Sequence, residues 1–267
     1  MSRKTAKIII FVAIIAVAVA LYFTLRGRKA NDNNTQTNTI DSTAQNQLEA
    51  AKTPDLGNKI EPTQDQPAPE EKKPTPQIPE KFSLDMPFYS QAPLSNWDAF
   101  HEEMCEEASL LNGGLYLLGK TLSTDSFEKE LMQLKKMEEK ELGDYKSNTI
   151  AEIKKISDIY FAGKIQSKII DNPTVEDIES EIARNNPVII SLSGRDIGNP
   201  NFTPPGPVYH MLVIKGYDSQ NFITNDVGTR KGNSYVYKKD VIMKNIHDWN
   251  AKDIHLGAKR VLVLMKN

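Results

Sequence analysis

The period of the apolar side chains changes at Asn186 and Pro187, and this change limits the fold more than any other feature of the sequence. Before it, apolar residues recur at helical spacing at residues 104–118, 123–141, 149–159 and 174–185. After it, short apolar or alternating runs of the kind that form strands occupy residues 188–193, 209–217, 222–225, 234–238 and 258–265. Helices followed by strands predict an α+β domain whose N-terminal helices pack on an antiparallel sheet.

The folded domain is predicted to span residues 82–267, and the chain before it contains one long apolar run. Residues 8–25 carry no charge and are just long enough to cross a bilayer as a helix. We therefore expect one transmembrane signal-anchor, with residues 1–7 as a cytoplasmic tail. The Ala-x-Ala motifs lie inside the apolar run and not after it, which disfavours a cleaved signal peptide.

The basic residues do not decide the orientation of this helix, because three of them flank it on each side. A tail of this length is easily left in the cytoplasm, so we place the domain outside. Residues 26–81, rich in Pro, Asn, Thr and Gln, are predicted to form a disordered linker. The expected localisation is the cell membrane, with a single-pass chain and an extracytoplasmic domain.

Composition narrows the classes of partner. The chain of 267 residues has a formal net charge of −2 and no basic face outside its N-terminus, which argues against nucleic acid. No metal-ligand spacing or cofactor motif is present, so we expect neither a metal nor a cofactor. The sequence leaves the oligomeric state open.

Cys105 is the only cysteine, and the apolar spacing places it in the first turn of a helix for which Asp98 is a candidate N-cap. Free N–H groups and the helix dipole at that position favour a reactive thiolate. Two observations oppose this interpretation. A lone helical cysteine is most often a small buried hydrophobe, and four nearby glutamates raise a thiol pKa. A catalytic Cys105 therefore requires a cationic partner.

His210 begins a predicted strand that continues into a hairpin. If the hairpin loop is centred on Asp218, Leu212 lies opposite Thr224 and His210 lies opposite Asp226. Directly opposed residues lie about 4.5–5.5 Å apart on one face. His210 and Asp226 then form a general base and its orienting carboxylate, as in thiol catalysis. A structural histidine and a turn-forming aspartate are the alternatives.

Five motifs resemble the C39-like peptidase family. They are MPFYSQAP at residues 86–93, NWD at 96–98, CEEAS at 105–109, PVYHMLVIKGYD at 207–218 and ITNDVGT at 223–229. The resemblance implies a papain-like cysteine peptidase fold, with Cys105 as the nucleophile, His210 as the general base and acid, and Asp226 orienting His210. It also implies that the Gln91 amide forms part of the oxyanion hole. The chain lacks the transporter segments of the best-known relatives, so their double-glycine leader substrate does not carry over.

These observations predict a membrane-anchored, extracytoplasmic cysteine peptidase that acts on a peptide or protein through an acyl-enzyme at Cys105. We expect residues 194–207 to line the substrate cleft, with Asn199, Phe202 and Tyr209 contacting substrate. Two alternatives remain. One is an inactive surface module of the same fold that binds peptides or the cell wall, and the other is a thiol acyltransferase or amidase.

Overall fold

The computed structural model describes residues 78–267. The predicted tail, transmembrane helix and nearly all of the linker lie outside the described residues, so the structure does not address them. Within residues 78–267, no helix has the length and apolar character needed to span a bilayer.

One antiparallel sheet forms the centre of the domain, with strand order β2-β7-β3-β4-β5-β6, and β1 pairs with β4 beside this path. The strands are β1 (Phe82–Ser83), β2 (Ile165–Asp171), β3 (Val188–Ser193), β4 (Tyr209–Tyr217), β5 (Asn221–Asn225), β6 (Tyr235–Lys238) and β7 (Arg260–Lys266). Every residue of β3 and β4 is buried. Both faces of the sheet are therefore covered at its middle.

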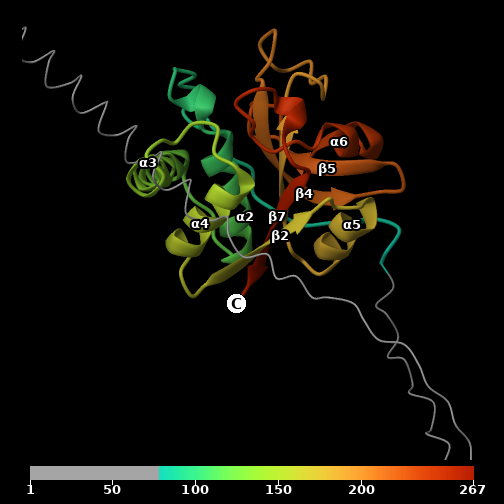
Figure 1. Cartoon of the computed structure of the whole chain (residues 1–267). Helices are drawn as coiled ribbons and strands as arrows, with labels where there is room; N and C mark the ends of the chain where they lie inside the picture. Colours follow the sequence, from blue (N-terminus) through green and yellow to red (C-terminus); the bar gives the residue numbers. More distant parts are fainter. Residues whose placement is uncertain (1–77) are drawn as a thin grey trace, which may run out of the picture. The chain divides into compact units, whose positions relative to one another are not determined.

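Helices cover both faces. They are α2 (Cys105–Leu117), α3 (Thr124–Glu141), α4 (Ile150–Tyr160), α5 (Val175–Ala183) and α6 (Lys239–Asn245), with short 3₁₀ turns η1 (His101–Glu103) and η2 (Ile254–Leu256). Figure 1 shows α2, α3 and α4 gathered on one side of the sheet and α5 and α6 on the other. Helix α2 packs against β3, β4 and β7. The predicted α+β architecture is confirmed.

Local signals define the helix starts well. Ser123 accepts a hydrogen bond from the Ser126 N–H at the start of α3. Thr149 and Thr174 form capping boxes with Glu152 and Asp177 at the starts of α4 and α5. The predicted bounds of these three helices are confirmed to within a few residues.

The spacing of apolar residues in the sequence does not predict β2 or α6. Strand β2 is an edge strand paired only with β7, and most of its residues are half-buried or exposed. A strand with little burial carries only a weak apolar alternation. Helix α6 has seven residues, two of them buried, which is too short for a helical period to be recognised.

The prediction that Asp98 caps the cysteine helix is wrong. Helix α2 begins after Met104 without a side-chain cap. Asp98 instead accepts hydrogen bonds from the N–H groups of Phe100 and His101, both at 3.0 Å, and holds the separate turn η1. The side chain of His101 contacts Asp98 at 2.8 Å and Glu128 at 3.0 Å.

The predicted register of the β4–β5 hairpin is also wrong. Tyr217 pairs with Phe222 and Ile214 with Thr224, and Lys215 forms a bulge between these pairs. The loop is centred later than expected because the Asp218 carboxylate accepts the N–H groups of Gln220 and Asn221, both at 2.8 Å. Asp218 therefore begins the turn and does not lie at its centre.

Candidate active site

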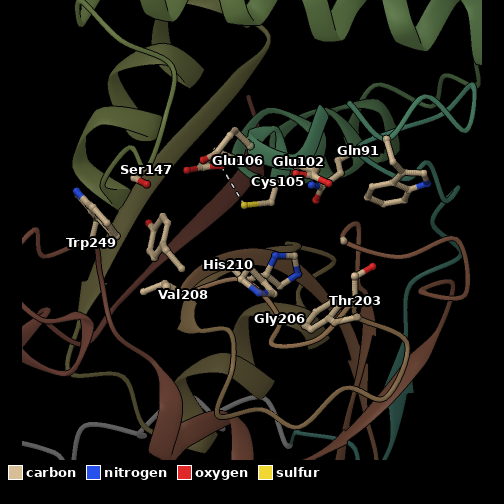
Figure 2. Close-up of a pocket in the computed structure, with 16 residues that line it drawn as sticks. Gln91, Glu102, Cys105, Glu106, Ser147, Thr203, Gly206, Val208, His210 and Trp249 are labelled. Carbon is tan, nitrogen blue, oxygen red and sulfur yellow. Dashed lines mark hydrogen bonds between the residues drawn. The ribbon is translucent and has the colours of Figure 1, made fainter. Parts of the chain in front are cut away.

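A cavity of about 490 Å³ opens between the start of α2 and the start of β4, and Cys105 and His210 both line it. In Figure 2 the thiol of Cys105 lies above the ring of His210, with residues of the loop 194–207 below. Phe202, Thr203 and Gly206 of this loop belong to the cavity wall. Part of the loop 194–207 therefore lines the cavity beside Cys105, and its contact with substrate stays a prediction.

Cys105 is the first residue of α2, as its spacing predicted. Its sulfur accepts a hydrogen bond from the Met211 N–H at 3.3 Å, which ties the helix start to the residue after His210. Its own backbone N–H donates to no acceptor among the described residues. Such a free donor at a helix start can stabilise negative charge.

The thiol of Cys105 donates a hydrogen bond to Glu106 Oε2 at 3.0 Å. Burial raises the pKa of the Cys105 thiol well above its ordinary value, and the charge and hydrogen bond of Glu106 raise it further. Burial also raises the pKa of Glu106 to about 7, although hydrogen bonds from Cys105, Asn148 and its own N–H lower it. No hydrogen bond joins Cys105 to the imidazole of His210 among residues 78–267. The thiol in this structure is protonated and engaged by Glu106.

His210 Nε2 lies 2.8 Å from Asp226 Oδ1, and both side chains are buried. The second carboxylate oxygen accepts hydrogen bonds from Asn199 Nδ2 at 2.8 Å and from the Tyr237 hydroxyl at 2.5 Å. Burial by itself raises the pKa of Asp226, but the His210 charge and these hydrogen bonds outweigh it and hold the pKa below its usual value. Asp226 therefore stays ionised and binds Nε2 of His210. Nδ1 is then the ring nitrogen that Asp226 does not contact.

The His210 ring is held from two further sides. Phe202 lies edge-on to it, with ring centroids 5.2 Å apart. A Cβ at Gly228 would lie 2.7 Å from His210 Cε1, so only glycine fits beside the ring without a shift. These contacts fix the imidazole plane at the edge of the cavity.

Gln91 lines the same cavity and is 4% exposed. Its Nε2 donates to the His101 carbonyl oxygen at 2.7 Å, which fixes the amide and leaves its second N–H without a partner of its own. The side-chain oxygen Oε1 has no hydrogen-bond partner in the described part of the chain. Gln91 and Cys105 thus both line the cavity, and each has an N–H group without an acceptor among the described residues.

The structure separates the three residues expected to contact substrate. Phe202 and Tyr209 line the cavity, and the Tyr209 hydroxyl donates to the Asn148 carbonyl oxygen at 2.8 Å. Asn199 does not line it. It lies behind the histidine and bonds Asp226, because its buried amide is drawn to the buried carboxylate.

Three contacts of this site cannot be predicted from the sequence. Tyr237 and the Gly228 N–H both bond Asp226, and no pattern in the chain indicates either pairing. The sequence shows that Glu106 follows Cys105, but the contact of Glu106 with the thiol depends on the side-chain rotamer. Among residues 78–267, no group of three or more His, Cys, Asp and Glu side chains is arranged to hold a metal ion.

A buried acidic cluster lies behind Cys105 and consists of Glu106, Glu107 and Glu138. Burial raises the pKa of Glu107 well above its usual value, with the charge of Glu138 adding to the shift. Burial raises the pKa of Glu138 to about 9, and the charge of Glu106 adds to that shift. At neutral pH Glu138 therefore keeps its proton.

Residues 83–253 match the protein-family description "Peptidase C39 like family". A crystal structure of a protein from Bacillus anthracis, provisionally described as a C39-like peptidase, aligns with a TM-score of 0.48 and 16% sequence identity. That alignment covers 71% of this chain and 99% of the other. No curated protein matches the chain. The family match includes Gln91, Cys105, His210 and Asp226.

Proposed function

The chain belongs to the C39-like peptidase family, and we propose that it is a cysteine peptidase that hydrolyses peptide bonds with Cys105 as the nucleophile. One observation carries the proposal. His210, whose Nε2 lies 2.8 Å from Asp226 Oδ1, lines the cavity that also contains Cys105 at the first position of a helix. These are the parts that thiol catalysis requires: a nucleophile, a base, and a group that orients the base.

In the proposed reaction, His210 takes the thiol proton and the sulfur of Cys105 attacks the carbonyl carbon of the scissile bond. The oxyanion receives hydrogen bonds from the Cys105 N–H and from the free N–H of Gln91. The carbon–nitrogen bond then breaks, and His210 returns the proton to the leaving amine. Water, deprotonated by His210, hydrolyses the thioester and restores the thiol.

One contact favours a second candidate function. The thiol donates to Glu106 and its pKa is raised, so the pair of thiolate and imidazolium is absent from this arrangement. A binding module of the same fold, without turnover, accounts for that contact directly. The peptidase proposal requires the thiol to rotate from Glu106 towards His210 Nδ1 when substrate enters.

Replacement of Cys105 by alanine in the full chain tests the two candidates. Hydrolysis of a library of unmodified peptides, followed by mass spectrometry, should fall by at least about a thousandfold, while the melting temperature stays close to that of the wild type. An amidase or acyltransferase would release ammonia or transfer the acyl group without cutting the peptide backbone. Cleavage that survives in the alanine variant contradicts the peptidase proposal, and a wild type that binds peptides without cutting them favours the binding module.

We also propose that residues 8–25 anchor the protein in the cell membrane, with the domain of residues 82–267 outside the cytoplasm on a linker. The charge-free length of that run supports this. In the cell of origin, the chain should sediment with membranes after carbonate extraction, and protease added to spheroplasts should digest the domain. Recovery in the soluble fraction contradicts the anchor, and protection from protease contradicts the orientation.

A further inference from the structure

The wall of the cavity beside Cys105 carries negative charge. Glu102, Glu103 and Glu106 line it, and among the described residues no lysine or arginine does. In the view of Figure 2 the Cys105 thiol lies between the side chains of Glu102 and Glu106. No salt bridge within residues 78–267 involves Glu102 or Glu103. Their charges are available to a ligand.

Two further features of this wall suit a cationic ligand. Trp97, Tyr209 and Trp249 line the cavity, and aromatic faces attract the ammonium or guanidinium group of a bound side chain. Gln91 Oε1 is a buried acceptor without a donor in the described part of the chain. A ligand that brings positive charge and N–H donors satisfies both. Lysine and arginine side chains have this chemistry.

The charge reverses at the other end of the cleft. A second cavity of about 510 Å³ shares the lining residues Trp97, Thr203 and Gly228 with the first, so the two cavities lie next to each other. Arg230 and Lys231 line it and are exposed, and no aspartate or glutamate of the described residues does. A peptide that lies along the cleft therefore meets a negative wall near Cys105 and a positive wall beyond Gly228.

We infer that the cleft selects peptides that place a lysine or arginine side chain against Glu102 and Glu103 and an acidic side chain against Arg230 and Lys231. The inference rests on the proposed peptidase function and names its substrate class. Opposite charges at the two ends also give a bound peptide one direction, because a reversed peptide would bring like charges together.

The preference for a basic side chain can be tested on the full chain with pairs of peptides. The two peptides of a pair are identical except that one has lysine where the other has norleucine. The ratio of kcat/KM for the lysine peptide over the norleucine peptide should be at least about tenfold, which corresponds to about 1.4 kcal/mol. In the Glu102→Gln/Glu103→Gln variant this ratio should fall towards one. The variant Glu176→Gln, altered at an exposed glutamate of α5 far from the cavity, should keep the wild-type ratio. Cleavage with a ratio near one in the wild type overturns the inference and leaves the peptidase function intact.

The preference for an acidic side chain at the second cavity, which Arg230 and Lys231 line, is tested by the same design. Peptide pairs that differ in glutamate against glutamine should show a preference for glutamate, and Arg230→Gln/Lys231→Gln should abolish it. The control Arg184→Gln alters an arginine of another surface, where it pairs with Glu181. A glutamate preference that survives in the double variant contradicts the assignment of the basic end.

A second measurement does not depend on turnover. Cys105 is the only thiol, so methanethiosulfonate reagents report on it alone. Its thiolate attacks the reagent sulfur, a mixed disulfide forms and methanesulfinate leaves. The cationic trimethylammonium-ethyl reagent should react at least about tenfold faster than the anionic sulfonato-ethyl reagent, and Glu102→Gln/Glu103→Gln should reduce that ratio.

If no peptide is cleaved, the proposed function fails but this ratio still decides the charge preference of the cleft. A ratio near one, or one that the double variant leaves unchanged, overturns it.

Discussion

His210 and Asp226 are hydrogen-bonded at 2.8 Å although they do not face each other across the hairpin. The register past the Lys215 bulge pairs Val213 with Asn225, so its continuation by one residue sets Asp226 opposite Leu212. His210 and Leu212 share one face because side chains alternate along a strand. Without the bulge, the register at Tyr217 would set Asp226 opposite Val213, on the other face. The single extra residue thus brings the carboxylate to the face of the histidine.

Replacement of Gly228 by alanine should reduce activity more than stability. The new Cβ would lie 2.7 Å from His210 Cε1 and 3.0 Å from Phe202 Cε1, so the imidazole must move. A displacement of this kind is expected to lower kcat/KM by roughly 10- to 100-fold. Peptide hydrolysis and urea unfolding, measured on the same preparation, separate the two effects.

Gly113→Ala is the matched control for that variant. Its Cβ would lie 2.9 Å from Leu264 Cδ1, the flexible end of a core side chain, and Gly113 does not line the cavity. This variant should lose stability by about 1 to 3 kcal/mol from overpacking and keep its activity per folded molecule. Equal losses of activity in the two variants would mean that crowding at Gly228 has no specific effect on His210.

Replacement of Glu106 by glutamine should make the thiol of Cys105 more reactive. The change removes a negative charge that raises the thiol pKa. Because the pKa of Glu106 is about 7, the wild type carries that charge only above neutral pH. Alkylation by iodoacetamide should therefore be similar in the two proteins near pH 6 and roughly tenfold faster in the variant near pH 8.

Mass spectrometry of the single thiol across this pH range gives both rates. The exposed variant Glu176→Gln should follow the wild type at every pH. A ratio of variant to wild type that does not change between pH 6 and pH 8 would show that the Glu106 charge does not act on Cys105.

Tyr237→Phe should shift the acid limb of the activity profile to higher pH. The Tyr237 hydroxyl and Asn199 donate to the same carboxylate oxygen of Asp226, and both lower the pKa of Asp226. Loss of one donor raises that pKa, so Asp226 takes up a proton at a higher pH and no longer orients His210. We expect a stability loss of about 1 to 2 kcal/mol.

The control for this variant is Tyr235→Phe on the same strand. The two rings lie 4.8 Å apart, and the Tyr235 hydroxyl has no hydrogen bond within residues 78–267. Its profile of kcat/KM against pH should match that of the wild type. If Tyr237→Phe also leaves the acid limb in place, the hydroxyl contributes packing only.

Glu138→Gln should stabilise the protein as the pH rises. Burial, followed by the charge of Glu106, raises the pKa of Glu138 to about 9 in the folded state, against 4.5 for the unconstrained side chain. The folded protein then holds a proton that the unfolded chain releases, so this group's contribution is complete below about pH 4.5 and is lost as the pH rises through 9. Glutamine has no proton to lose and can still accept from Asn148 Nδ2, which lies 3.0 Å from Glu138 Oε2.

The free energy of unfolding in urea, measured at pH 5, 7 and 9, tests this. The difference between variant and wild type should grow in favour of the variant by roughly 2 to 4 kcal/mol between pH 5 and pH 9. Glu176→Gln, whose side chain is exposed, should show a difference that is small and constant. If the difference in unfolding free energy between Glu138→Gln and the wild type does not change with pH, Glu138 titrates normally in the folded state.

The sequence by itself determined the elements that carry the chemistry. Helical spacing around Cys105 predicted that it begins a helix, and α2 begins there. The capping residues Thr149 and Thr174 marked two more helix starts, because a cap depends on neighbours within one turn. These signals are local, so a single chain without any structure is enough to read them.

Only the tertiary structure decided how these elements meet. The Lys215 bulge depends on the hairpin turn and on β1, whose Phe82 oxygen would lie 2.7 Å from a Cβ at Gly216. The partnership of Asp226 with Tyr237 and Asn199, and the contact of Cys105 with Glu106, depend on which side chains are buried together. Desolvation strengthens each of these hydrogen bonds and charge interactions, and desolvation is a property of the packed fold.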